Sequence, residues 1–404
     1  MKRLFVIAAA ALVVVAASFA VESDRSSVGA ASSNYEVWVA DQGTDQVHVL
    51  RPDKNDLELV ATIDFPPLSK PHMILFGLHG RPGSRYGYVS NVGSGNTSVI
   101  DAEARAIVAV IPTGVRTHAS QPSPDGRRAL SLALGPAPCS AAPDCGQITE
   151  ILTDTDNGVF TPGRTFRYSN LAALAPDKAS LLLSFNPVCG SFTPDSRYFY
   201  VTFSSGGLAI FEVNDDPDLP LFNVVDILGV GTGAGQIAPN GCGIGYSVDG
   251  RLMFANSATA TQSFYYVFDI ATHTLIKSEQ ISDVVSDVHG MMLDPDGKDV
   301  VMAGRLSDNF IVINQKNGEL RANKTFSSSP GDAPDLTDFS PDGKWLYVTL
   351  RGPHPATTGA HPNPGLTPGV LVVTFSAGKV ERIVELPGDP QVQDPHGIAV
   401  RRLN

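Results

Sequence analysis

Short apolar segments recur along the chain, and tight turns separate them. Residues 198–202, 264–268 and 345–349 are typical, because each is rich in aromatic and β-branched side chains. No stretch keeps the helical spacing of apolar positions over several turns. The pattern predicts an all-β chain built from short strands.

The turn between these strands has a recurring sequence close to Pro-Asp-Gly. Proline presets its own φ, aspartate bonds the backbone that follows it, and glycine adopts the positive φ that closes a hairpin. We expect the turns to mark units of four strands, each of about 45 to 60 residues. Copies of the turn lie at residues 123–126, 193–196, 247–250, 294–297 and 340–343.

Seven such units can be counted, and the first is split between the two ends of the chain. Residues 35–65 supply three strands with no inner strand before them, whereas residues 395–400 form a last strand without a unit of its own. We therefore predict a seven-bladed β-propeller with four-stranded blades, closed by pairing residues 395–400 with residues 36–40. The other six units begin near His72, His118, Cys189, Cys242, His289 and Asp335.

The second unit resembles one copy of the YVTN repeat. Its three matching segments are Tyr-Val-Ser-Asn at 88–91, Asn-Thr-Ser-Val-Ile-Asp at 96–101 and the strand at 107–114. Looser copies lie at residues 199–202 and 346–349. This family is similar to lactonase-like and quinoprotein-amine-dehydrogenase-like propellers, so the resemblance implies the fold. It does not imply one function, since propellers carry many unrelated activities.

Aligning the units on their turns places one residue of each inner strand at an equivalent position. In a propeller the inner strands line the central channel, so these residues are expected to face a shared axis at one mouth of the channel. Four of the chain's nine histidines share this position. The predicted ring is His396, His72, His118, Val188, Cys242, His289 and Asp335.

Two interpretations of this ring stay open from the sequence. Neutral imidazoles from neighbouring strands can bind copper or zinc, with Asp335 as a fifth ligand or an orienting carboxylate, and they can also act as general bases. Alternatively, each imidazole only bonds the backbone of the neighbouring blade. The candidate metal ligands are His72, His118, His289, His396 and Asp335.

The four cysteines are expected to form two disulfides, as is usual in exported proteins. Cys139 and Cys145 are close in sequence and would staple a loop, and Cys189 would pair with Cys242 on the adjacent blade. A Cys242 thiolate that binds metal is the alternative.

Two long connections, at residues 135–146 and 352–369, are expected to emerge on the face that holds the ring. His354 and His361 in the second connection could add ligands or shape a lid.

The first residues have the three-part layout of a secretory signal peptide. Lys2 and Arg3 precede an apolar run at residues 4–17, and small residues then mark a cleavage site before Val21. We therefore expect a signal peptide at 1–20, a flexible segment at 21–34 and a single propeller domain at 35–404. The mature chain, which has no apolar run long enough to span a membrane, would be secreted, periplasmic or held at the cell surface.

The net charge of −12 at pH 7, without a basic cluster, argues against nucleic acid as a partner. We expect a monomeric binding or scaffold protein of the cell envelope that holds a small molecule, a metal ion or an envelope protein at the channel mouth. The alternative is an enzyme, either a lactonase-like hydrolase or a copper or zinc enzyme that uses the four channel histidines. Metal storage or delivery by the same ligands is a third hypothesis.

Overall fold

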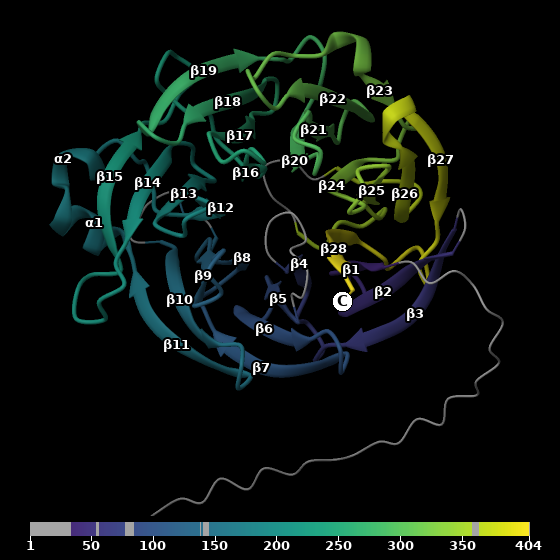
Figure 1. The fold of residues 1–404 in the computed structure, drawn as a ribbon, viewed down its shortest axis with the longest axis horizontal. Coiled ribbons are helices and arrows are strands. Elements are labelled where there is room, and N and C mark those ends of the chain that lie inside the picture. The colour runs from purple at the N-terminus through teal and green to yellow at the C-terminus, as the bar shows by residue number, and fades with distance from the viewer. Residues whose placement is uncertain are drawn as a thin grey trace, which may run out of the picture. The chain divides into compact units, whose positions relative to one another are not determined.

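The computed structural model describes residues 34–53, 56–76, 85–137, 139, 145–357 and 363–403. These residues form seven four-stranded antiparallel sheets, arranged as blades around a central channel (Figure 1). The predicted seven-bladed propeller is therefore confirmed. The expected signal peptide at 1–20 and nearly all of the expected flexible segment at 21–34 lie outside the described residues.

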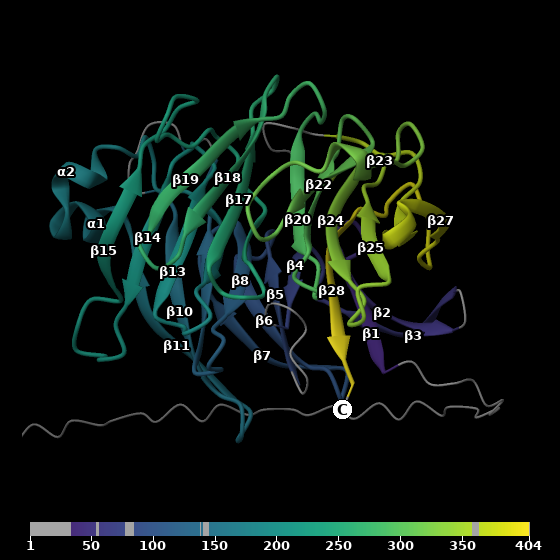
Figure 2. The ribbon, with the colours of Figure 1, turned by 45° about the horizontal axis from the view of Figure 1, so that its top comes forward.

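Each blade contributes one strand to each of four concentric layers (Figures 1 and 2). The innermost strands are β4 (Pro71–Leu75), β8 (Thr117–Pro122), β12 (Pro187–Phe192), β16 (Ile244–Tyr246), β20 (Val288–Leu293), β24 (Pro334–Phe339) and β28 (Pro395–Arg402). The second strands are β1 (Tyr35–Asp41), β5 (Tyr86–Asn91), β9 (Arg128–Ala133), β13 (Tyr198–Phe203), β17 (Leu252–Ala258), β21 (Asp299–Gly304) and β25 (Trp345–Leu350).

The third strands are β2 (Gln46–Asp53), β6 (Asn96–Asp101), β10 (Gln147–Asp154), β14 (Leu208–Val213), β18 (Ser263–Asp269), β22 (Asn309–Asn314) and β26 (Gly369–Thr374). The outermost strands are β3 (Asp56–Asp64), β7 (Ala106–Pro112), β11 (Val159–Phe166), β15 (Phe222–Leu228), β19 (Thr274–Gln280), β23 (Phe326–Ser327) and β27 (Lys379–Val384).

The two ends of the described chain meet in the first blade, as predicted. Strand β28 pairs antiparallel with β1, with Trp38 opposite Ala399 and Val39 opposite Ile398. The Asp41 carboxylate accepts a hydrogen bond from the backbone N–H of Asp394 at 2.8 Å, just before β28 begins. This pairing leaves no open edge between the first and last blades.

Apolar side chains between neighbouring blades form the core. Trp38 of the first blade is fully buried and packs edge-on against Phe76 of the second, with ring centroids 5.2 Å apart. The second strands β1, β5, β9, β17 and β21 are buried along their whole length, whereas the outer strand β7 alternates mainly between exposed and half-buried positions. Since each blade covers its neighbours, burial of apolar area holds the ring together at roughly 25 cal/mol per Å².

A glycine follows the histidine on β20 and on β28, because the inner strands approach each other there. A Cβ on Gly397 would lie 2.7 Å from the carbonyl oxygen of His72 and 2.8 Å from the Cα of Met73. A Cβ on Gly290 would lie 2.0 Å from the carbonyl oxygen of Asp335. All three distances are shorter than van der Waals contact, so the crowding of the inner strands requires glycine at both positions.

Two short helices, α1 (Tyr168–Leu174) and α2 (Pro176–Ala179), follow β11 and were not predicted from the sequence. They lie at the outer rim beside β15 (Figure 1). Leu171 and Ala179 are their buried residues, and both join a core cluster with Phe166 and Phe185. The 3₁₀ turns Ala322–Lys324 and Phe375–Ala377 are the other helical segments among the described residues. No helix in the described ranges has the length and hydropathy needed to cross a membrane.

Replacing Gly397 by alanine tests the close approach of β28 to β4. We expect the free energy of unfolding to fall by about 1–3 kcal/mol, because the added methyl group would overlap backbone atoms that cannot rotate away. Gly229→Ala is the matched control, since a Cβ there meets nothing closer than 3.5 Å. Chemical denaturation of both variants measures the difference, and equal stabilities would contradict the packing described for β28.

Asp41 makes the closure of the ring dependent on pH. Burial raises the pKa of Asp41 to about 6, although hydrogen bonds from the backbone N–H groups of Asp394 and Gly43 act to lower this pKa. The protonated carboxyl is therefore favoured by the fold. This contribution to stability is complete below the ordinary pKa of 3.8 and is lost as the pH rises through about 6.

Asp41→Asn should remove this pH dependence, because asparagine keeps an accepting oxygen and carries no charge. Relative to the wild type, we expect the variant to gain on the order of 3 kcal/mol of stability between pH 4 and pH 7. Denaturation midpoints measured across this range provide the test. A stability difference between the two proteins that does not change with pH would show that Asp41 does not titrate in this way.

Candidate functional site

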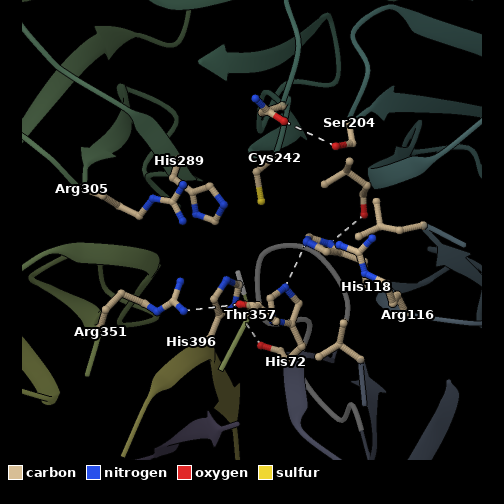
Figure 3. A pocket seen from close by; sticks show the side chains of 14 residues that line it. His72, Arg116, His118, Ser204, Cys242, His289, Arg305, Arg351, Thr357 and His396 are labelled. Carbon is tan, nitrogen blue, oxygen red and sulfur yellow. Dashed lines mark hydrogen bonds between the residues drawn. The ribbon is translucent and has the colours of Figure 1, made fainter. Parts of the chain in front are cut away.

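The predicted ring lies in a pocket at one mouth of the channel (Figure 3). Four imidazoles come from the starts of inner strands, namely His72 on β4, His118 on β8, His289 on β20 and His396 on β28. Val188 and Cys242 also line the pocket, as expected. The enclosed volume is about 110 Å³, which suits an ion or a small molecule with a few waters rather than a polymer.

Asp335 is the exception to the predicted ring. It lies at the equivalent position on β24, but it is fully buried behind His289 and His396 and does not line the pocket. Its carboxylate contacts His289 Nδ1 at 2.5 Å and His396 Nε2 at 3.4 Å. The expectation that Asp335 faces the channel was therefore wrong, because neighbouring side chains close over it.

The Nδ1 atom of each ring histidine is held by an acceptor. Carbonyl oxygens can only accept hydrogen bonds, so His118 Nδ1 donates to Val188 at 3.0 Å and His396 Nδ1 donates to His72 at 3.0 Å. His289 Nδ1 faces the Asp335 carboxylate. These partners fix both the tautomer and the orientation of each ring.

The fourth imidazole, His72, is oriented through Gln42. The Gln42 amide nitrogen donates to Asp394 at 2.7 Å, which directs the amide oxygen toward His72 Nδ1 at 2.9 Å. His72 Nδ1 is therefore a donor as well. Asp394, which accepts the hydrogen bond from Gln42, lies directly before β28. The closing strand therefore also supports the site.

This orientation leaves two bare nitrogens facing each other. In their neutral forms, His72 and His118 carry their single ring proton on Nδ1, and each Nε2 has a lone pair. The two Nε2 atoms are 3.0 Å apart. Two lone pairs at this distance repel each other unless a cation, either a proton or a metal ion, lies between them.

Burial keeps three of the four imidazoles neutral. Burial lowers the pKa of His118 to about 4, and together with the neighbouring imidazoles it holds the pKa of His72 well below the ordinary 6.5. Burial likewise holds the pKa of His396 well below 6.5, although Asp335 opposes this shift. A shared proton between His72 and His118 is therefore disfavoured at neutral pH.

His289 behaves differently from the other three. Burial and Arg305 lower its pKa, but Cys242 and Asp335 outweigh them and raise it to about 9. His289 is thus an imidazolium at neutral pH, paired with the Asp335 carboxylate. Asp335 stays ionised, because His396, His289 and Arg351 lower its pKa well below 3.8 despite its burial.

His289, Asp335 and His396 also have candidate ligand atoms within 4.8 Å of one another. The charge of Asp335 is already compensated, however, since Arg351 Nη1 lies 3.1 Å and Arg305 Nη1 3.8 Å from its oxygens. Two guanidinium groups beside this carboxylate disfavour a further cation on it. Asp335 is better suited to orient His289 than to bind an ion directly.

The pocket is also lined by arginines, which the sequence interpretation missed. Arg305 follows β21 and Arg351 follows β25, so both occupy the position directly after a second strand. Arg116 lies just before β8 and is half-buried. The residues that directly follow the second strands form an outer ring, which an alignment of those strands would have revealed. The members of this outer ring that line the pocket are Val92, Leu134, Ser204, Arg305 and Arg351.

The cysteines agree only in part with the two predicted disulfides. The Cys139–Cys145 disulfide is present. The expected Cys189–Cys242 disulfide is not formed, and the two residues are buried free thiols with Sγ atoms 3.2 Å apart. The hydrogen bond between the two thiols lowers the pKa of Cys242, and His289 lowers it further. Burial raises the pKa of Cys189.

The described part of the long loop between β25 and β26 reaches the pocket through Thr357. Thr357 lines the pocket and accepts a hydrogen bond from Gln42 at 3.1 Å. His354 is exposed and does not line the pocket. His361 lies outside the described residues. The described part of this loop therefore covers the mouth as expected, without His354 as an added ligand.

No protein-family model and no curated protein sequence matches this chain. Membership of the YVTN family therefore stays a prediction from the sequence. Solved structures with the same fold include a periplasmic gluconolactonase from Pseudomonas aeruginosa, at a TM-score of 0.64 and 15% identity over 92% of this chain and 99% of that one.

Two further solved structures are similar. A putative 6-phosphogluconolactonase from Bacteroides uniformis has a TM-score of 0.62 and 16% identity over 91% of this chain and all of its own. A functionally unknown protein from Desulfotomaculum acetoxidans has a TM-score of 0.64 and 15% identity over 92% of this chain and all of its own. At these identities the likeness shows the fold alone: the chain is a seven-bladed propeller whose structural neighbours include lactonase-like propellers.

Proposed function

We propose that this protein is an exported binding protein that holds a copper or zinc ion at the channel mouth. The proposed ligands are the Nε2 atoms of His72 and His118, and His396 packs against this pair. His289 and Asp335, which the sequence also nominated, orient the site and balance its charge.

The facing nitrogens of His72 and His118 carry this proposal. Imidazole nitrogens bind such ions at about 2.0–2.1 Å, so two of them on one ion are separated by about 2.9 Å in a tetragonal copper site and by about 3.3 Å in a tetrahedral zinc site. The observed distance between the two Nε2 atoms is 3.0 Å. Because burial disfavours a proton between them, a metal ion is the cation that suits this pair.

His396 supports this pair and is not a proposed ligand. Its ring stacks on His72 with centroids 3.7 Å apart, and it lines the same pocket. Its Nδ1 donates to the His72 carbonyl and its Nε2 lies 3.4 Å from the Asp335 carboxylate, so both of its nitrogens already face protein groups. Neutral imidazole is a good ligand for both zinc and copper, which is why the two metals are proposed together.

An envelope location is part of the proposal. The signal-peptide pattern at residues 1–20, the Cys139–Cys145 disulfide and the periplasmic location in the name of a structural neighbour all favour it. The three arginines around the pocket would favour an anionic group as a further ligand of the bound ion.

A lactonase-like hydrolase is the second candidate, suggested by the names of the structural neighbours. Such an enzyme would need a general base near the lactone. His289 is the ring histidine with a carboxylate partner, but its pKa of about 9 leaves it protonated at neutral pH. A protonated imidazole cannot take up another proton, so the geometry favours binding over hydrolysis.

Metal binding can be tested on the full chain purified from the compartment to which it is exported. After treatment with a chelator, we expect titration with Cu²⁺ or Zn²⁺ to give one ion per chain. His72→Ala and His118→Ala should each weaken binding by at least a hundredfold, because each removes a ligand. Gln42→Leu should weaken it by about ten- to a hundredfold, because it removes the acceptor that orients His72.

His354→Ala is the matched control, since His354 is an exposed histidine outside the pocket, and binding to this variant should equal that of the wild type. Calorimetry gives the affinities, and circular dichroism checks that each variant is folded. Absence of stoichiometric binding, or equal binding by all four variants, would contradict the proposal.

Lactone hydrolysis separates the two candidate functions. We expect no turnover of gluconolactone or 6-phosphogluconolactone above the rate in buffer, with or without added metal. Base consumption at constant pH measures the rate directly. Turnover that disappears in His289→Ala would instead support the hydrolase and overturn the assignment as a binding protein.

A further inference from the structure

Two free thiols meet at the boundary between the fourth and fifth blades. Cys189 lies on β12, and Cys242 lies just before β16. Their Sγ atoms are 3.2 Å apart, and the two residues are only 3% and 4% exposed. A small movement of either side chain would bring the sulfurs to bonding distance, so the pair can cycle between dithiol and disulfide.

The two thiols differ in what they can reach. Cys242 lines the pocket at the channel mouth, and it also lines a second chamber deeper in the channel. Cys189 lines only the deeper chamber. A small molecule that enters at the mouth therefore meets Cys242 first, and Figure 3 shows the Cys242 sulfur pointing into this pocket.

A charged pair lies next to the accessible thiol. His289 and Cys242 both line the pocket, and the His289 ring is directed toward the Cys242 sulfur (Figure 3). On the opposite side of the ring, His289 Nδ1 contacts the Asp335 carboxylate at 2.5 Å. Asp335 is fixed in turn by Arg351 at 3.1 Å. A thiol, an imidazole and a carboxylate in this order resemble the arrangement that activates sulfur nucleophiles in enzymes.

We propose that Cys242 and Cys189 form a thiol–disulfide exchange site for small disulfides, with Cys242 as the attacking group and Cys189 as the resolving group. This activity does not depend on the proposed metal site, whose ligands are other residues. The pocket volume of about 110 Å³ limits the substrate to low-molecular-weight disulfides.

The reaction balances without a further reactant. The Cys242 thiolate attacks one sulfur of the disulfide R–S–S–R, forms a mixed disulfide and releases the first R–S⁻, which takes up a proton. Cys189 then gives up its proton and attacks Cys242 Sγ, which releases the second thiol and forms the Cys189–Cys242 disulfide. The protein pair loses two protons and two electrons, and the substrate gains both.

The test uses full-length protein carrying Cys139→Ser and Cys145→Ser, so that the loop disulfide cannot react. The protein is reduced with a phosphine, freed of reductant and metal, and incubated with bis(2-hydroxyethyl) disulfide. Intact-mass spectrometry then follows the products. We expect the wild-type pair to lose two hydrogens, to release two thiols and to accumulate no adduct.

Single variants in this background identify the role of each thiol. Cys189→Ser should accumulate a mixed disulfide on Cys242, because no resolving thiol remains. Cys242→Ser should stay unmodified in the folded state and react only after unfolding in urea. His289→Gln, added to Cys189→Ser, should slow adduct formation at least tenfold in the folded protein and leave the rate in urea unchanged.

Three results would overturn the proposal. One is a folded pair that the phosphine cannot reduce, which would make it a structural disulfide. Another is an adduct that forms on Cys189 as fast as on Cys242. The third is a reduced, folded wild-type pair that does not react. Because the protein is freed of metal before the reaction, none of these results bears on the metal site.

Discussion

The antiparallel pairing of β28 with β1 is the constraint on which the rest of this structure depends. It joins the two ends of the chain in one blade, with Val37 opposite Val400 and Trp38 opposite Ala399. With the ring closed, equivalent residues of seven separate strands converge on one axis. The support of the site depends on the same closure, because Asp394, just before β28, binds both Gln42 and Arg351.

The sequence left two interpretations of the histidine ring open, and the structure shows that they are compatible. His396 and His118 do bond the backbone of a neighbouring blade, as the structural interpretation expected, but each uses only Nδ1 for this purpose. The other nitrogen of His118 faces His72 Nε2 at 3.0 Å, whereas that of His396 faces the Asp335 carboxylate at 3.4 Å. A hydrogen bond that positions a blade thus also sets the tautomer that a metal ligand requires.

Most of the fold could be predicted from the sequence, because turns and strand alternation are local signals. The Pro-Asp-Gly turns and the orphan strand at residues 395–400 were sufficient for the number of blades, the closure and the residues of the inner ring. The α1–α2 segment escaped prediction, because its helices are only 7 and 4 residues long and are held by burial of Leu171 and Ala179. Packing of this kind leaves no periodic pattern.

The site was harder to predict, since its chemistry depends on contacts between blades. The alignment located Asp335 at the ring position but could not reveal that His289 and His396 cover it. Arg305 and Arg351 were missed because they belong to a second ring, one position after the second strands. The even number of cysteines and the adjacent blades predicted a Cys189–Cys242 disulfide, but neither signal reports oxidation, so the free thiols could be known only from the structure.

The proposed metal ion would lie between the facing nitrogens of His72 and His118. Anomalous diffraction at the copper and zinc absorption edges, from crystals grown with either metal, would locate such an ion. We expect one anomalous peak at about 2.0–2.1 Å from both Nε2 atoms. An ordered pocket without such a peak, with the two nitrogens still 3.0 Å apart, would contradict it.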